Sequence, residues 1–136
     1  MSQENVEIVR GIYDAVARRD AAAPFEVYAE EIVWDVSNAR RGALMSKPVY
    51  RGHDGVREFW RDGLSVFGEI NLEVEGLIDA GDQVLAVIRE REVGRASGAP
   101  VETAHLAVWT LTDGKVVQMQ VFDDRQEALE AAGLRE

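Results

Sequence analysis

Apolar and polar residues alternate with a period near two along residues 103–124, which predicts two long strands joined by a tight turn near residues 112–114. On the second strand, Val117, Met119 and Val121 fall on one face, which we expect to be the buried one. The register of this hairpin decides which residues of the first strand share that face. A shift of one residue would move every side chain of a strand to the opposite face.

Two turns fit this hairpin. A three-residue loop of residues 112–114 places His105 on the same face as Asp123, whereas a two-residue turn of residues 113–114 places the two side chains on opposite faces. We favour the three-residue loop because it collects the apolar side chains of both strands on one face. These side chains are Trp109, Leu111, Val117, Met119 and Val121.

The rest of the chain alternates between helical spacing of apolar residues and strand-like alternation. An irregular stretch interrupts this pattern before the second long helix, and polar turn residues separate the strands that follow. The predicted elements, in order, are a helix over about residues 3–18, a short helix after Asp20, a strand at 32–36, a loop over 37–51 with a short edge strand near 48–50, a helix from Gly52 to Phe67, strands at 69–75 and 84–93, the hairpin, and a short helix capped by Asp124.

This order of elements implies an α+β fold, in which a curved antiparallel sheet wraps around the N-terminal helices. The result is a cone-shaped α+β barrel with a blind cavity, formed by a single domain over residues 1–136. Aromatic and apolar side chains on the inner faces are the candidates for the cavity wall. They are Tyr13, Tyr28, Trp34, Phe59, Trp60, Trp109, Met119 and Val121.

Charge and composition narrow the classes of partner. A formal net charge of −10, with scattered basic residues, disfavours nucleic-acid binding. No cysteine is present, which excludes disulfides and thiolate metal sites, and the two histidines, His53 and His105, lack the spacing of a metal motif. We therefore expect no metal and no cofactor. The polar N-terminus and the lack of a long apolar run predict a cytoplasmic protein that does not bind a membrane.

Three motifs carry a resemblance to a known family. They are G-x-x-x-V-R-E-F-W-x-x-x-L at residues 52–64, W-T-L-T-D-G-K-V-V at 109–117, and D-R-Q-E-A-L-E-A-A-G-L at 124–134. Together with the order of elements they resemble the SnoaL-like branch of the nuclear transport factor 2-like superfamily, over nearly the whole chain. The resemblance implies the cone fold. It says less about function, because that superfamily includes ketosteroid isomerases, epoxide hydrolases, polyketide cyclases and transport adaptors.

The catalytic residues of those relatives do not carry over position by position. The base of the ketosteroid isomerases matches Val36, next to Asp35, and their tyrosine matches Ile12, next to Tyr13. The carboxylate that cyclases and epoxide hydrolases carry on the last strand matches Val121, an apolar residue. The resemblance therefore supports none of these mechanisms residue by residue.

Three polar residues remain as catalytic candidates. His105 is the first, because imidazole exchanges protons near neutral pH and similar cyclases carry a histidine on this strand. Asp123 can act as a base or orienting group, or alternatively favour the following helix N-terminus. Arg89 is the third candidate, since the resemblance implies that Leu85 and Val87 on its face point inward. Alternatively, Arg89 lies at a solvated strand end and pairs with glutamates.

These observations leave three interpretations open. The first is a cofactor-independent isomerase, cyclase or hydrolase that acts on a small hydrophobic substrate by acid/base chemistry. The second is a non-catalytic binding protein for a small hydrophobic molecule. The third is a dimerisation module whose outer sheet face, with Leu106, Val108 and Phe122, forms a homodimer.

Overall fold

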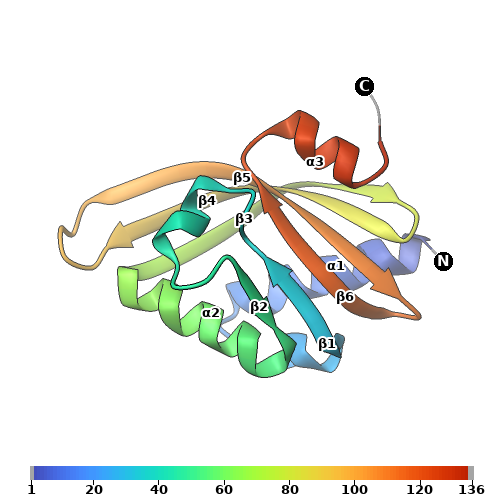
Figure 1. The fold of residues 1–136 in the computed structure, drawn as a ribbon, viewed down its shortest axis with the longest axis horizontal. Helices are drawn as coiled ribbons and strands as arrows, with labels where there is room; N and C mark the ends of the chain where they lie inside the picture. The colour runs from blue at the N-terminus through green and yellow to red at the C-terminus, as the bar shows by residue number, and fades with distance from the viewer. Residues whose placement is uncertain (1, 135–136) are drawn as a thin grey trace.

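The computed structural model describes residues 2–134, which form helices packed on the two faces of one curved sheet (Figure 1). All the elements expected from the sequence are present, although the second helix is reduced to a single 3₁₀ turn. The elements, in order, are α1 (Ser2–Ala17), the 3₁₀ helix η1 (Ala23–Glu26), β1 (Tyr28–Asp35), the 3₁₀ helix η2 (Arg40–Leu44), β2 (Val49–Arg51), α2 (Gly52–Val66), β3 (Phe67–Ala80), β4 (Gln83–Gly94), β5 (Pro100–Thr112), β6 (Lys115–Phe122) and α3 (Arg125–Ala131).

The sheet has the strand order β2-β1-β6-β5-β4-β3. Strands β3 to β6 form an antiparallel meander, as the sequence predicts. One pairing differs from the expected antiparallel sheet, because β1 runs parallel to β6. A parallel pair needs a long crossover connection, and here α2 and the meander separate the two strands in sequence.

The two faces of the sheet carry separate hydrophobic clusters. Helices α1 and α2 lie over the inner face, where the larger cluster contains Val9, Trp34 and Trp109. Helix α3 packs on the opposite face, where Leu129 contacts a smaller cluster (Figure 1). No helix within residues 2–134 has both the length and the apolar composition that a membrane span needs.

The β5–β6 hairpin has a two-residue turn, so our preference for the three-residue loop is wrong. Thr112 pairs with Lys115, and the turn residues Asp113 and Gly114 both have positive φ, at 50° and 77°. This backbone matches the right-handed twist of the flanking strands. The register then shifts by one residue, because Val117 has no partner between the pairs Thr110–Gln118 and Leu111–Val116.

The bulge at Val117 changes which side chains point inward. Val116, rather than Val117, belongs to the inner cluster, together with Met119 and the partly buried Val121. The shift also cancels the effect of the shorter turn, because Ala107 pairs with Val121 on the inner face. His105 therefore faces inward even with a two-residue turn, contrary to the consequence expected for that turn.

Strand β4 points the opposite set of residues inward from the set that the resemblance implies. Val84, Ala86 and Ile88 belong to the inner cluster, whereas Leu85 and Val87 lie against the outer one. The alternation continues beyond Ile88. Glu90 and Glu92 follow on the inner face and are buried, with 5% and 1% of their surface exposed.

Candidate functional site

A small cavity lies inside the cone, between α1, α2 and the inner face of the sheet. Its volume is about 80 Å³, and most of its lining is apolar. All eight side chains proposed from the sequence as wall residues line it, as does His105. Those eight are Tyr13, Tyr28, Trp34, Phe59, Trp60, Trp109, Met119 and Val121.

The titratable pair in this cavity is His105 on β5 and Glu90 on β4. The Nδ1 atom of His105 lies 3.5 Å from Oε2 of Glu90, and the two side chains are 11% and 6% exposed. Because Ile88 pairs with His105 and Glu90 pairs with Thr103, the two are diagonal neighbours on one face of the sheet. Within residues 2–134 no acceptor lies in hydrogen-bond geometry to Nδ1, and the contact becomes an ion pair when the imidazole is protonated.

Tyr13 brings a hydroxyl group from α1 to the same cavity. Trp109 Nε1 donates a hydrogen bond of 3.1 Å to the Tyr13 hydroxyl oxygen, and the two rings meet edge to face with centroids 5.6 Å apart. Burial raises the pKa of Tyr13 far above its usual range, the Trp109 hydrogen bond opposes this, and the charge of Glu90 adds to it. The phenol therefore stays protonated and keeps its own hydrogen to donate.

Trp34 on β1 provides a second donor. Its ring packs against Tyr28, Phe59 and Trp109, each with a centroid distance of 5.6 Å. The indole is buried and lines the cavity, and within residues 2–134 no atom accepts a hydrogen bond from its Nε1. An indole N–H that lacks an acceptor in a cavity is costly unless a water or a ligand supplies one.

The loop that follows β1 closes one side of the cavity, where Ala39, Gly42 and Met45 contribute to the wall. Gly42 approaches the residue that follows β1 so closely that a Cβ atom would lie 2.0 Å from the carbonyl oxygen of Val36. No larger residue fits there without a shift of the backbone.

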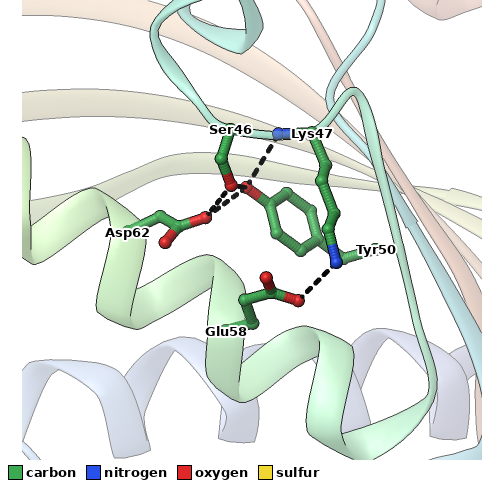
Figure 2. Close-up of polar contacts among 5 residues, drawn as sticks. All are labelled: Ser46, Lys47, Tyr50, Glu58 and Asp62. Atoms are coloured by element: carbon green, nitrogen blue, oxygen red, sulfur yellow. Dashed lines mark hydrogen bonds and ion pairs between the residues drawn. The ribbon is translucent and has the colours of Figure 1, made fainter.

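A cluster of polar side chains fastens this loop to α2 (Figure 2). Tyr50 donates a hydrogen bond of 2.7 Å from its hydroxyl to Asp62 Oδ2, and Ser46 donates to the same carboxylate oxygen. Lys47 adds a 2.8 Å ion pair from Nζ to Glu58. The pKa of Asp62 lies below its usual value. The hydrogen bond from Ser46 lowers it most, and the hydrogen bond from Tyr50 has the second largest effect.

Asp123 contacts the loop that follows β1 and does not line the cavity with His105, contrary to the expected placement. Its Oδ2 atom accepts a 2.6 Å hydrogen bond from the backbone N–H of Arg40 and lies 3.6 Å from Arg40 Nε. The carboxylate therefore holds the start of η2 in the loop, and it does not line the cavity. The neighbouring Asp124, rather than Asp123, caps α3 through the N–H groups of Gln126 and Glu127.

Arg89 lies on the outer face of β4 and does not line the cavity, contrary to its expected inward orientation. It follows the outward-facing Leu85 and Val87 on β4, and its guanidinium binds Glu75 at 3.0 Å and Glu102 at 2.8 Å. The alternative of a solvated strand end paired with glutamates describes this residue. The resemblance misassigned the face of β4, and Arg89 followed from that error.

Glu90 is the site residue that the sequence analysis missed. Inward-facing residues of β4 recur at every second position, at Val84, Ala86 and Ile88. The next position in this alternation is Glu90, so the pattern alone could have predicted that Glu90 faces inward. The surrounding charges of residues 89–92 instead indicated a solvated strand end. His53 is no partner of this site, since its Nε2 lies 3.0 Å from the carbonyl oxygen of Tyr28, and residues 2–134 contain no cluster of three possible metal ligands.

Comparisons with known proteins agree with this architecture. TerC, co-crystallised with polyporic acid, is 22% identical, with a TM-score of 0.79 over 96% of this chain and 98% of TerC. A nuclear transport factor 2-like protein from Burkholderia thailandensis E264 is 28% identical, with a TM-score of 0.77 over 96% of this chain and 97% of that one. A proposed SnoaL-like polyketide cyclase from Jannaschia sp. CCS1 is 19% identical, with a TM-score of 0.73 over 99% and 95%.

The similarity in structure thus identifies the fold, and the sequence identifies the family. No curated protein matches the chain significantly in sequence. The profile of the SnoaL-like domain, however, matches residues 9–119. The fold is the α+β cone of the nuclear transport factor 2-like proteins, and the chain belongs to the SnoaL-like domain family.

Proposed function

We propose that the protein binds a small hydrophobic molecule in the cavity and moves a proton on it without a cofactor. The observation that carries this proposal is the placement of the His105–Glu90 pair in an otherwise apolar enclosure. Two buried donors, Trp34 Nε1 and the Tyr13 hydroxyl, line the same space. A base and donors for a developing negative charge are the elements that proton transfer requires.

The reaction runs as follows for a ligand with a carbonyl group. Neutral His105 takes a proton from the carbon next to the carbonyl. The electron pair of the broken C–H bond forms a C=C bond while the C=O π pair moves onto the oxygen, which gives an enolate. The Trp34 N–H and the Tyr13 O–H donate hydrogen bonds to that oxygen. Glu90 is a positioning residue, because it orients the imidazole and stabilises the imidazolium. Return of the proton to the opposite face of that carbon, or to the γ-carbon of a dienolate, completes an isomerisation. In a cyclisation the carbanion attacks a second carbonyl carbon of the ligand, and the new alkoxide takes the proton from the imidazolium.

Exchange of carbon-bound hydrogen tests this chemistry directly. Cyclohexanone is a single ring with exchangeable hydrogens next to its carbonyl, and NMR measures their replacement by deuterium in D₂O. We expect the wild-type protein to accelerate this exchange and His105→Ala to lower the rate at least about tenfold. Arg89→Gln, on the outer face, serves as the control and should exchange at the wild-type rate. Equal rates for wild type and His105→Ala would contradict the catalytic proposal.

Binding without turnover is the second candidate function, and the same buried donors favour it, because a ligand acceptor would satisfy Trp34 Nε1. Mass spectrometry of small molecules released from the purified protein tests this function. We expect a molecule that wild type retains and that Trp34→Phe loses, since that change keeps the ring packing and removes the donor. Retention together with undetectable cyclohexanone exchange would assign the cavity to binding alone, and equal retention by Trp34→Phe would contradict the role of its N–H.

A homodimer through the outer sheet face remains a proposal. Leu106, Val108 and Phe122 lie on that face, where α3 covers them within one chain, and they are 8%, 0% and 5% exposed. A dimer would therefore use the part of the face beyond α3, such as the partly buried Val87. Light scattering gives the mass of the protein in solution, and a monomer at micromolar concentration would rule this proposal out.

A further inference from the structure

A second, more open hollow of about 360 Å³ adjoins the cavity, between the C-terminal end of α1, η1 and α2. Four residues line both spaces: Val16, Tyr28, Trp60 and Ile70. The hollow is therefore the outer compartment of the same site, separated from the inner one by side chains.

The size of the inner cavity calls for a second compartment. Its volume of about 80 Å³ is smaller than the ~150 Å³ engineered cavity that binds benzene in another protein. A six-membered ring such as cyclohexanone must therefore extend partly into the outer compartment, and a larger ligand must extend further. The wall there includes Phe25 and Pro24, and Leu64 is 43% exposed although it is apolar.

Arg57 presents a flat cation at this compartment. Its guanidinium carbon lies 4.5 Å from the centroid of the Phe25 ring, a cation–π contact. Nη1 of Arg57 donates 3.0 Å to Asp54, whose side chain is fully exposed, so this ion pair holds the arginine weakly. A guanidinium has five N–H donors, and it can bind an anion in two-point fashion while it remains over the ring.

Arg19 adds a second positive charge to the wall. Its Nη1 donates 2.9 Å to the carbonyl oxygen of Ile70, and its Nη2 donates 2.8 Å to Oδ1 of Asn71. Both acceptors are uncharged, so they fix the position of the Arg19 guanidinium without neutralising its positive charge. The third charged residue of the wall, Asp20, accepts from the backbone N–H groups of Ala22 and Ala23. The charged residues that line the hollow are thus two arginines and one aspartate, with Asp54 paired to Arg57 outside the wall, on a protein whose net charge is −10.

We propose that the outer compartment binds the anionic end of a planar aromatic acid whose apolar part reaches the inner cavity. Arg57 binds the carboxylate or sulfonate, with Arg19 adding electrostatic attraction, and Phe25, Leu64 and Trp60 contact the ring system. This assignment rests on the proposed function, because it names the class of ligand that the cavity takes. It explains why an acidic protein gathers arginines beside an apolar hollow.

Two fluorescent probes that share one ring system test the proposal. 8-Anilinonaphthalene-1-sulfonate carries a sulfonate, and N-phenyl-1-naphthylamine is the neutral counterpart. We expect the anionic probe to bind wild type about tenfold more tightly than the neutral one, as a charge-assisted hydrogen bond provides. Added salt should reduce this preference. Equal affinities at low salt would overturn the proposal.

Variants at Arg57 locate the anion. Arg57→Gln should abolish the preference for the anionic probe without lowering the affinity for the neutral probe. Arg57→Lys should keep part of the preference for the anionic probe. The matched control is Arg61→Gln, the same change at an exposed position one turn further along α2, outside the compartment. An equal loss in Arg61→Gln would show that general charge, rather than this compartment, attracts the probe.

Leu64 tests the location independently, since its exposed side chain tolerates a polar replacement without a large cost to folding. Leu64→Glu should lower the affinity for the anionic probe several-fold more than Leu64→Gln does, because the added carboxylate repels the sulfonate. The cyclohexanone experiment separates the two proposals. If the anionic probe binds preferentially through Arg57 but hydrogen exchange does not depend on His105, only the catalytic function is contradicted. If exchange depends on His105 but the anionic probe is not preferred, only the proposal for the outer compartment is contradicted.

Discussion

The Nδ1 atom of His105 lies 3.5 Å from Oε2 of Glu90, between diagonal positions of two neighbouring strands inside the cone. This distance is longer than a usual hydrogen bond. It nevertheless places a carboxylate oxygen beside Nδ1, a buried ring nitrogen that makes no hydrogen bond within residues 2–134. His53 shows the opposite arrangement, because its Nε2 faces a carbonyl oxygen, which can only accept.

The two histidines should therefore adopt opposite neutral tautomers. We expect His105 to carry its proton on Nδ1 and His53 to carry its proton on Nε2, as measured by ¹⁵N NMR of the rings. Glu90→Leu removes the acceptor and should shift His105 toward the other tautomer, whereas Glu90→Gln keeps an acceptor and should shift it less. His53 is the internal control. An unchanged His105 spectrum in Glu90→Leu would contradict the positioning role of Glu90.

Tyr50→Phe should loosen the loop of residues 37–48 without disturbing the meander. The change removes the hydroxyl that donates to Asp62 and accepts from the Lys47 backbone N–H at 3.3 Å. We expect the free energy of unfolding to fall by about 1 kcal/mol, the usual net contribution of one intramolecular hydrogen bond. Hydrogen exchange should accelerate in the loop. Equal acceleration in β4 would mean that the whole fold, and not the loop, had been weakened.

Gly42→Ala should lower the free energy of unfolding, whereas the same substitution at an open position should not. The new Cβ would meet the Val36 carbonyl oxygen at 2.0 Å, so the loop must shift and the cavity wall with it. We expect a loss of about 2 kcal/mol or more in the free energy of unfolding, typical of overpacking. Gly11→Ala is the control, because nothing lies within 4 Å and the helix should gain about 0.5–1 kcal/mol. Urea unfolding of both variants checks the contrast.

Stability should fall steeply above about pH 10. Burial raises the pKa of both Tyr13 and Tyr28 far above the usual value of 10.0. Between pH 10 and the folded-state pKa values, the unfolded chain releases these protons and the folded chain keeps them, so the unfolded state gains stability. Each tyrosine contributes a decline of about 1.4 kcal/mol per pH unit. Tyr13→Phe should flatten the decline measured by urea unfolding, and an identical slope would contradict the assignment.

Local patterns predicted the elements well, because the spacing of apolar residues and the caps depend on neighbours in sequence. Helix α1, the edge strand β2 and the Asp124 cap of α3 all lie where the sequence predicts them. The same alternation located the inner face of β5 and pointed to the wall residues around Trp109. On β4 the alternation also reached Glu90, although the charges around it concealed the residue's role.

Contacts between distant segments were not predictable in the same way. Asp123 and Arg40 are 83 residues apart, and only the packing of the loop against the end of β6 decides that the carboxylate binds there. Arg89 faces outward because β4 pairs with β3 and β5 in one particular register, which a charged segment does not specify. The parallel pairing of β1 with β6 has the same origin.

In the β5–β6 hairpin, the local sequence and the tertiary packing determine different features. The sequence by itself determined that residues 103–124 form two strands and that the apolar residues of each line a face, because alternation with a period of two is a property of the local backbone. The tertiary structure decided that Val117 bulges, because a bulge forms where the packing of both strands against the helices outweighs one lost ladder position. That single residue returns His105 to the inner face, where it meets Glu90.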